Sequence, residues 1–306
     1  MIPALNEERH IQRCIQSIRD NVPSGVSYEV LVGDHGSSDA TAMRAQGEGA
    51  RVYSIGRCTV GELRNRLVAY AQGRVLVFID ADCRLTDGWR QKIETVLGSL
   101  ESEPRQLTGS KCVPPPDGGF VCRYWFQPLA ATPTSYIGTG HMVVPVVTFS
   151  SLGGFDPMLE SGEDYEFCVR AKSAGVAIVP DPALLVIHDG FPSTIGAFVR
   201  REAWHGSGDL NSVAAFLSSR VAVASVLFVS VQFAALALSL IAPALAIGLG
   251  VLLLAVLYLA SVAKFGPLRV VSRIANMTIM YFYFAGRFLA LFPWLARRRQ
   301  FTREPA

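Results

Sequence analysis

Val75-Leu76-Val77-Phe78-Ile79 is the strongest strand signal in the chain, and Asp80-Ala81-Asp82 follows it directly. A continuous apolar run of this kind is typical of a central strand that is covered on both faces. Over roughly the first two hundred residues, strand-like runs alternate with helical patterns, which predicts an α/β sheet with crossover helices.

Before this strand, the elements follow ordinary start and stop signals. Asn6 is a good N-cap residue, and isoleucines at helical spacing follow it from Ile11 to Ile18. Residues 29–33 predict a buried strand that ends at Asp34. Further expected elements are a helix from about residue 39, a strand at 51–55 and a helix at 60–72 that Gly73 stops.

Beyond Asp82 the pattern is less regular. Residues 114–119 are rich in Pro and Gly and predict an exposed loop. Strand signals return at 142–147 and 176–179, and a helix is expected between them at 163–174.

A long apolar segment closes the chain. Residues 221–263 contain no Asp, Glu, Lys or Arg. They would form about 65 Å of helix, twice the roughly 30 Å hydrocarbon core of a bilayer. We therefore expect a domain at 1–210 and a membrane region at 211–306, with spanning helices at about 221–242 and 244–263 and a turn near Pro243.

A third apolar segment, at about 274–296, lies between a basic connection and the basic tail 297–299. Both basic stretches prefer the cytoplasmic side, and a full span would put one of them on the wrong side. The segment is expected to be re-entrant or interfacial, and a third span is the alternative.

Charge and cysteine usage narrow the class of protein. A net charge of +3, without basic residues interleaved with aromatic ones, argues against nucleic acid as a partner. The six cysteines form no CxxC pair, which indicates thiols in a reducing compartment. No secretory signal precedes the first domain, so we expect an inner or plasma membrane protein whose catalytic domain is cytoplasmic.

Asp80 and Asp82 carry the clearest chemistry. They lie at the carboxyl end of a central strand, where open α/β sheets bind ligands. Carboxylate oxygens suit Mg²⁺ or Mn²⁺ that keeps further positions for water and a diphosphate. The alternative is a polar exit from the strand with no ligand.

Several different short motifs follow one another between residues 2 and 208. They are Pro3-Ala4-Leu5-Asn6-Glu7-Glu8, Asp34-His35-Gly36-Ser37-Ser38-Asp39-Ala40-Thr41, Arg64-Asn65, Phe78-Ile79-Asp80-Ala81-Asp82-Cys83, Gly138-Thr139-Gly140-His141, Gly153-Gly154-Phe155-Asp156, Gly162-Glu163-Asp164 and His188. Together they resemble family 2 glycosyltransferases with the GT-A fold, a Rossmann-like nucleotide-sugar transferase domain.

This resemblance implies roles for individual residues. Asp82, with Asp80 and His188, would hold the metal ion, and Asp164 would be the general base of an inverting displacement. The implied donor-binding residues are Pro3, Asn6, Glu7, Asp34, Arg64 and Asp80. The implied acceptor-side residues are His141, Glu163, Arg201 and Trp204.

Each role has a structural alternative. Asp164 follows Ser161 at capping-box spacing, and Glu163 can complement a helix dipole. Asp34 can form an Asx-type turn, and Asp39 suits an N-cap. The remaining alternatives are a core histidine at His188, a solvated helix face at Arg64 and an interfacial anchor at Trp204.

The chain departs from the family pattern in three places. The Gln-x-x-Arg-Trp motif of processive synthases is absent near Arg200, which favours a non-processive enzyme. His35 stands where the family usually has a second acid in the nucleotide-binding turn. The identity of the nucleobase of the donor therefore stays open. The strand that normally precedes Pro3 is expected to be missing.

We therefore expect a metal-dependent, inverting, non-processive transferase. It would move a sugar from a nucleotide-sugar donor to a polyprenyl-linked or membrane-proximal glycan acceptor. The alternative is a catalytically degenerate membrane subunit that recruits partners. Sugar-phosphate nucleotidyl transfer fits less well, because a glycine-rich phosphate loop is absent near the amino terminus.

Overall fold

Strand β4 (Val75–Ile79) belongs to a four-stranded sheet of order β4-β7-β6-β8. β7 (His141–Pro145) runs antiparallel to β4 and to β6 (Gln106–Gly109), and β8 (Ala177–Pro180) runs parallel to β6. The sheet is thus mixed, because β7 runs against its neighbours.

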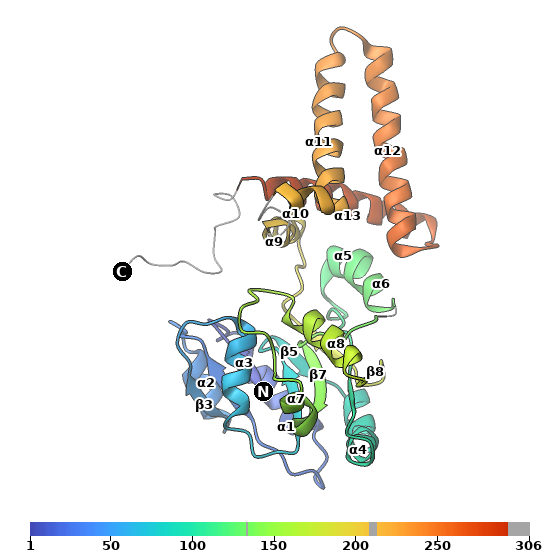
Figure 1. The fold of residues 1–306 in the computed structure, drawn as a ribbon. Coiled ribbons are helices and arrows are strands. Elements are labelled where there is room, and N and C mark those ends of the chain that lie inside the picture. Colours follow the sequence, from blue (N-terminus) through green and yellow to red (C-terminus); the bar gives the residue numbers. More distant parts are fainter. Residues whose placement is uncertain (133, 208–212, 293–306) are drawn as a thin grey trace. The chain divides into compact units, whose positions relative to one another are not determined.

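The computed structural model describes residues 1–132, 134–207 and 213–292 (Figure 1). They form two compact units. Met1–Pro115 and Ala130–Gly190 make the first, and Pro116–Leu129 and Phe191–Ala306 belong to the second. This division differs from the boundary expected at residue 210, because α9 (Ile195–Ser207) packs against α13 (Val270–Leu289) of the second unit.

Side chains of β4 alternate between two hydrophobic cores. Phe78 packs on one face with aromatic rings that include Phe155. Ile79 packs on the other face with Ile2 and Ile11. The prediction of a strand covered on both faces is therefore confirmed.

The first strand is present, which corrects the expectation that it is missing. β1 (Ile2–Ala4) runs parallel to β2 (Leu31–Asp34), and β2 runs parallel to β3 (Arg51–Ser54). The amide of Ile79 donates to the carbonyl of Met1 at 3.2 Å, which brings β1 beside β4. A strand of three residues leaves too short an apolar pattern to be recognised.

Helices of the first unit begin later or end earlier than expected. Asn6 has a φ of 55° and caps no helix, and the first helix begins at Ile11. The predicted helix at 60–72 ends at Val68. The helices are α1 (Ile11–Asn21), α2 (Thr41–Gly47), α3 (Val60–Val68), α4 (Asp87–Ser102), α7 (Val146–Ser151) and α8 (Glu163–Ser173).

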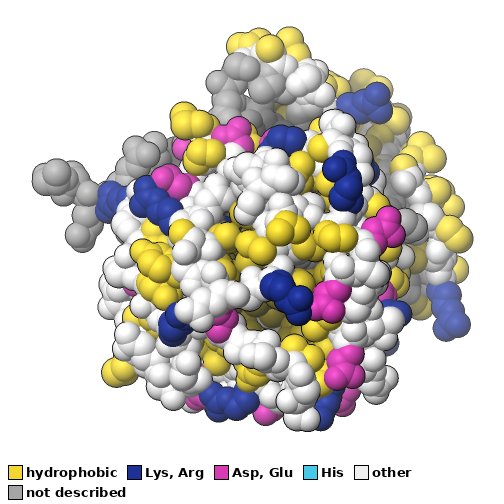
Figure 2. Space-filling model, turned by 60° about the horizontal axis from the view of Figure 1, so that its bottom comes forward, with side chains coloured by type: hydrophobic (Ala, Val, Ile, Leu, Met, Phe, Trp, Pro, Cys, Tyr) yellow, Lys and Arg dark blue, Asp and Glu magenta, His cyan; other side chains and the backbone are white. Residues whose placement is uncertain are grey.

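A two-stranded sheet completes the first unit. β5 (Cys83–Leu85) pairs antiparallel with β9 (Val186–His188), and Cys83 lies opposite His188. Basic and acidic side chains are interspersed among hydrophobic ones on the face shown in Figure 2.

The second unit is helical. It begins with α5 (Gly119–Val121), the π-helical turn η1 (Cys122–Phe126) and α6 (Gln127–Ala130), where the sequence predicted no helix. α9, α10 (Val213–Ser218), α11 (Arg220–Leu238), α12 (Pro243–Phe265) and α13 (Val270–Leu289) follow.

Two of these helices, α11 and α12, are long and apolar enough to cross a membrane. They stand side by side as a hairpin, with Pro243 in the first turn of α12, where its missing N–H costs no helical hydrogen bond (Figure 1). α13 lies across the base of the hairpin and contacts both helices (Figure 1). Residues 293–296 of the predicted third segment, and the basic tail, lie outside the described residues.

Candidate functional site

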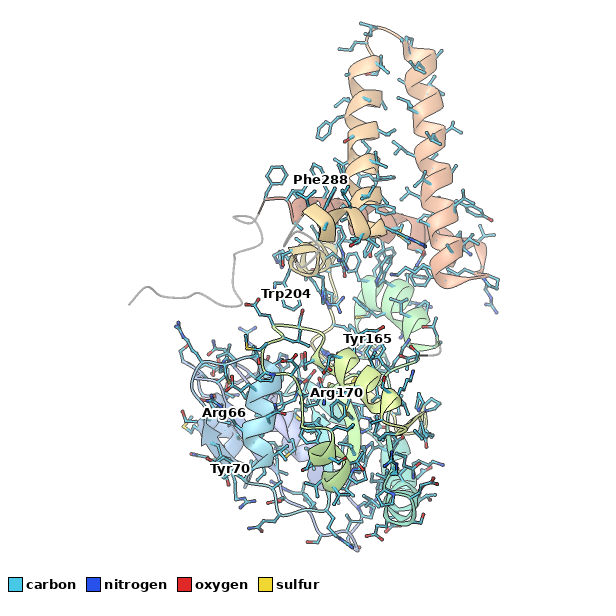
Figure 3. The ribbon with its side chains drawn as sticks, in the orientation of Figure 1. Arg66, Tyr70, Tyr165, Arg170, Trp204 and Phe288 are labelled. Carbon is cyan, nitrogen blue, oxygen red and sulfur yellow. The ribbon has the colours of Figure 1, made fainter. Side chains whose placement is uncertain are left out.

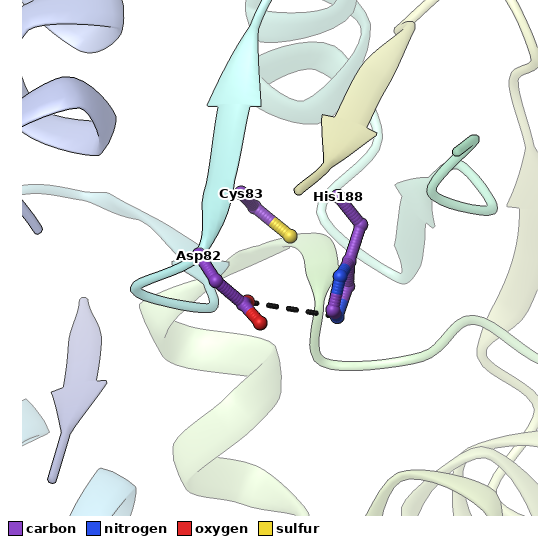
Figure 4. A group of neighbouring side chains, drawn as sticks. All are labelled: Asp82, Cys83 and His188. Atoms are coloured by element: carbon purple, nitrogen blue, oxygen red, sulfur yellow. Dashed lines mark ion pairs between the residues drawn. The ribbon is translucent and has the colours of Figure 1, made fainter. Parts of the chain in front are cut away.

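The turn after β4 places Asp82 beside His188. The pairing of β5 with β9 sets Cys83 opposite His188, so that the imidazole faces the acidic turn. Asp82 Oδ1 lies 3.5 Å from His188 Nε2 (Figure 4). Potential ligand atoms of Asp82, Cys83 and His188 all lie within 4.8 Å of one another.

These donor atoms fit a divalent metal ion. A carboxylate oxygen and an imidazole nitrogen suit Mn²⁺, and a carboxylate also suits Mg²⁺. The Cys83 thiol is buried, and its Sγ lies 3.8 Å from Cys112 Sγ. The contact with Cys112, and then burial, raise the pKa of Cys83 well above its usual value, which makes it the poorest ligand of the three.

Negative charge accumulates around this turn. Burial raises the pKa of Asp82, and Asp80 adds to the effect while His188 opposes it. Burial also raises the pKa of Glu7, with smaller contributions from Asp82 and Asp80 against a hydrogen bond from His10. A bound divalent cation would offset this repulsion, so the residues fit such an ion.

Gly190 allows the loop after β9 to approach Asp82. A Cβ atom at Gly190 would overlap Asp82 Oδ2 and lie 2.9 Å from His188 Cε1. The amide of Asp189 donates to the backbone carbonyl of Asp82 at 2.8 Å. Position 190 therefore requires a glycine, because any side chain would collide with the Asp82 carboxylate.

Two arginines anchor the same loop. Arg84 Nε lies 3.1 and 2.9 Å from the two carboxylate oxygens of Asp189, and Arg13 Nη1 lies 3.3 Å from Oδ2. Sequence patterns did not predict a role for Arg13, Arg84, Asp189 or Gly190. Asp189 and Gly190 follow His188 directly in the sequence, whereas Arg13 and Arg84 reach this loop only through the fold.

Arg64 is buried between two acidic side chains. It is 3% exposed and donates to Asp80 Oδ1 at 2.8 Å and to Glu163 Oε1 at 2.7 Å. Buried neighbours on the same face of α3, such as Leu63 and Leu67, hold it inside. Arg64 therefore orients Asp80, and the alternative of a solvated helix face is wrong, while its contact with the donor phosphates stays a prediction.

Glu163 is also enclosed. Its carboxylate accepts from Arg64 and, at 3.4 Å, from Thr139 Oγ1. Glu163 thus has its hydrogen-bond partners inside the protein, and its acceptor-side role stays a prediction.

Asp164 is half-buried at the start of α8. Burial, and next the charge of Glu163, raise the pKa of Asp164 above its ordinary value. The N-cap is Gly162 with a φ of 81°, and no side chain caps the helix, so the capping-box alternative with Ser161 is wrong.

A glycine-containing loop separates Asp164 from Asp80. A Cβ atom at Gly138 would lie 3.3 Å from Asp164 Oδ2, and one at Gly140 would lie 3.3 Å from Asp80 Oδ2. The two acids thus line opposite ends of one short loop before β7.

Two tyrosines border Asp164. Tyr165, on α8, packs its ring against Tyr136 at a centroid distance of 5.6 Å (Figure 3). Both rings are exposed. Aromatic faces of this kind pack against the apolar faces of ligands, and the sequence analysis missed both residues.

His141 is a core residue, which corrects its predicted acceptor contact. It is fully buried, and burial lowers its pKa to about 3. Trp89 Nε1 donates to its Nε2 at 2.9 Å, and its Nδ1 lies 3.1 Å from Ser110 Oγ. Both ring nitrogens are therefore used inside the protein.

Predicted donor residues gather at the carboxyl ends of β1 and β2. Asn6 Oδ1 accepts from the amide of Ser38 at 2.8 Å, and Asp34 accepts from the amide of Ser37 at 3.2 Å. This bond reaches the amide three residues on, whereas an Asx-type turn uses the amide two residues on, so the turn expected at Asp34 is not formed. Pro3 pairs with Gly33 inside β1, and the Glu7 carboxylate contacts His10 at 2.8 Å.

Asp39 accepts from the amide of Thr41 at 3.0 Å, but the N-cap of α2 is Ala40, so the N-cap expected at Asp39 lies one residue too early. Arg201 and Trp204 lie on α9 of the second unit, with Trp204 exposed (Figure 3).

This chain is similar in sequence to known glycosyltransferases. The model of glycosyl transferase family 2 matches residues 1–121, and that of glycosyl transferase family group 2 matches residues 120–291. Glycosyltransferase AglE of Haloferax volcanii is 24% identical over 228 residues, which cover 69% of this chain and 72% of that protein. Glucosyl-3-phosphoglycerate synthase of Mycobacterium tuberculosis is 40% identical over 90 residues, 27% of this chain and only 28% of the synthase.

One solved structure resembles nearly the whole chain. It is the mannosyltransferase PcManGT from Pyrobaculum calidifontis in complex with GDP-Man and Mn²⁺. The TM-score is 0.55 at 16% identity, and the match covers 95% of this chain and 86% of that one. At this identity the likeness establishes a shared fold.

Proposed function

The chain belongs to glycosyl transferase family group 2, and we propose that it transfers a sugar from a nucleoside-diphosphate sugar with the help of a divalent metal ion. One observation carries the proposal. Asp80, beside the metal ligands, and Asp164, with its raised pKa, line opposite ends of the Gly138–Gly140 loop. A transferase needs these two functions on the two sides of the reacting sugar.

Asp82 and His188 would hold the ion, with Asp80 alongside. When bound, Mg²⁺ or Mn²⁺ offsets the negative charge that develops on the leaving diphosphate. Arg64 keeps the Asp80 carboxylate turned toward this region, since both guanidinium nitrogens are fixed by carboxylates.

Asp164 would act as the general base. A carboxylate with a raised pKa accepts a proton more readily than a solvated aspartate does. The acceptor hydroxyl oxygen bonds to the anomeric carbon as the bond from that carbon to the diphosphate oxygen breaks, and the hydroxyl proton passes to Asp164. A single displacement of this kind inverts the anomeric centre.

The donor base and ribose would lie near Asn6, Glu7 and Asp34. Their loops meet at the carboxyl ends of parallel strands, where α/β sheets bind nucleotides. The mannosyltransferase of the same fold was solved with GDP-Man and Mn²⁺, which supports a nucleotide sugar and a metal ion.

The acceptor would be polyprenyl-linked or a membrane-proximal glycan. The apolar hairpin of α11 and α12 supports this class, because it would hold the protein at a bilayer where such acceptors lie. The first unit would be cytoplasmic, since Lys264 and Arg269 flank the end of the hairpin. The name of glucosyl-3-phosphoglycerate synthase indicates a phosphoglycerate acceptor, but that enzyme matches this chain over 90 residues only.

A second candidate is a catalytically degenerate membrane subunit. The burial of Arg64 favours this alternative, because a buried guanidinium group is less available to the donor phosphates. It predicts no turnover of any donor.

The test is release of nucleoside diphosphate from a panel of nucleotide sugars by the protein in detergent. The panel is run with Mn²⁺, Mg²⁺ or EDTA, and with membrane lipid extract as the acceptor source. We expect metal-dependent release that Asp82→Ala and Asp164→Asn abolish and that Asp20→Asn, an exposed change on α1, leaves intact. Release that persists in EDTA or in both site variants would refute the proposal, and absence of release with every donor would favour the subunit.

A further inference from the structure

Helices α9 and α13 of the second unit cross at a glycine on each helix. A Cβ atom at Gly286 would lie 2.9 Å from Glu202 Cβ and 3.0 Å from the carbonyl of Val199. One at Gly206 would lie 2.8 Å from Ala290 Cβ. The two backbones therefore approach more closely than larger residues would permit, and polar side chains beside the crossing are forced together.

One carboxylate meets two guanidinium groups at this crossing. Glu202 is 3% exposed and accepts from Arg201 Nη1 at 3.1 Å and from Arg287 Nε at 3.2 Å. A single negative charge thus faces two positive charges.

Lys264 brings a third cation from the end of α12. Its Nζ lies 5.0 Å from the centre of the Tyr283 ring, and the guanidinium of Arg287 lies 5.3 Å from the same centre. Two like charges therefore share one aromatic ring. We call Arg201, Glu202, Lys264 and Arg287 the basic cluster.

The basic cluster carries an excess of positive charge. Among the described residues of the second unit, the acidic side chains are Asp117 and Glu202. Burial lowers the pKa of Arg201, and Arg287 adds to the effect while Glu202 opposes it. Desolvated cations that repel one another are stabilised by an anion.

The position of Lys264 indicates where that anion comes from. Lys264 lies next to the last residue of the apolar helix α12, and α13 lies across the base of the hairpin (Figure 1). If α12 spans a bilayer, the end of that helix lies at the level of the lipid headgroups. Aromatic rings, including Trp125 at 5.2 Å from Lys264 Nζ, surround the cation, as is common at that depth.

We propose that the basic cluster binds the phosphate group of a membrane lipid. The proposal rests on the membrane association in the proposed function and deepens its acceptor half. Guanidinium groups bind phosphate oxygens through paired, charge-assisted hydrogen bonds, and the ammonium adds a third contact. The phosphate belongs either to a polyprenyl-linked acceptor or to an ordinary anionic phospholipid.

The test measures lipid affinity without sugar transfer, so that it can fail or succeed independently of the proposed activity. The full chain in neutral detergent is titrated with undecaprenyl phosphate, phosphatidylglycerol, phosphatidylcholine or inorganic phosphate. The dissociation constant is measured by microscale thermophoresis for the wild type, Lys264→Gln and Arg201→Gln. Arg269→Gln, an exposed change just before α13, is the matched control.

We expect at least one anionic lipid to bind, with an affinity that falls about tenfold in each cluster variant and stays unchanged in Arg269→Gln. Binding of undecaprenyl phosphate alone would identify the acceptor as the source, and equal binding of phosphatidylglycerol would identify the bilayer lipid. Three results would overturn the proposal: no binding of either anionic lipid, equal binding of phosphatidylcholine or free phosphate, or equal losses in all three variants. Lys264→Gln guards against misfolding, because Lys264 is exposed and contacts aromatic rings rather than the Glu202 carboxylate.

Discussion

Arg64 Nη2 lies 2.8 Å from Asp80 Oδ1, and this ion pair ties the buried face of α3 to the acidic turn after β4. The second amino group of the same guanidinium is held by Glu163, so that one buried cation pairs with acids from two distant parts of the chain. The direction of the Asp80 carboxylate therefore depends on α3 and α8 together.

Replacement of Arg64 by Gln should impair both stability and turnover. It leaves Glu163 and Asp80 without their counter-charge, and breaking a buried pair of this kind costs about 3–5 kcal/mol. Urea unfolding measures the first effect and nucleoside diphosphate release measures the second.

The matched control for Arg64→Gln is Arg66→Gln, on the exposed face of the same helix (Figure 3). Its surface pair with Glu62 contributes about 0–1 kcal/mol. Equal losses in the two variants would show that the buried network has no special role.

Replacement of Gly190 by Ala should weaken metal binding. The added methyl group would displace the Asp82 carboxylate from its place beside His188. Changes that disturb the orientation of a metal ligand typically cost about 10–100-fold in affinity. Titration of Mn²⁺ followed by electron paramagnetic resonance measures the loss. Gly98→Ala is the control, because open space surrounds that position on α4, and unchanged Mn²⁺ affinity in Gly190→Ala would contradict the placement of the ion.

Substitutions of His188 and Cys83 should affect Mn²⁺ affinity to different extents in the same titration. His188→Gln removes an imidazole ligand and should lower Mn²⁺ affinity by about 10–100-fold, whereas Cys83→Ala should change it less than about threefold. The reason is that the Cys83 thiol is buried against Cys112 and is a soft ligand, which Mn²⁺ and Mg²⁺ do not favour. The reverse order of effects would point to a thiolate site for a softer metal.

The acid limb of kcat/KM should report Asp164. Because burial and Glu163 raise its pKa, the rate should rise with pH through a value above the ordinary 3.8 of an aspartate. Glu163→Gln removes one cause of that rise and leaves Arg64, which lowers the pKa of Asp164, so the limb should move to lower pH.

Glu166→Gln is the control for this shift. Glu166 lies on the same helix and pairs with Arg170 at 2.7 Å (Figure 3). A limb that stays in place in Glu163→Gln, or that moves equally in both variants, would assign the titration to another group.

Much of the fold was predictable because its signals are local. The apolar run 75–79 and the acids after it lie next to each other in sequence, so one pattern predicts both strand β4 and the acidic turn, although β4 is the end strand of its four-stranded sheet. The break before Pro243 was visible for the same reason.

The missed features depend on contacts between distant residues. The pair of Arg84 and Asp189 exists only because β5 pairs with β9, and no local pattern predicts that pairing. Arg64 is an intermediate case, since Leu63 and Leu67 mark an apolar helix face, but the acids that permit a buried arginine come from elsewhere.

The path of the chain through its two units has a consequence for how the protein is made. The polypeptide enters the second unit at Pro116, returns to the first at Ala130 and leaves it finally at Phe191. Neither unit is a continuous stretch, so no single cut of the gene yields either one whole. During synthesis the short helices of residues 119–126 emerge long before their packing partners Phe228 and Tyr283, and until those arrive the apolar side chains of Trp125 and Phe126 lack the cluster that buries them and are prone to aggregation.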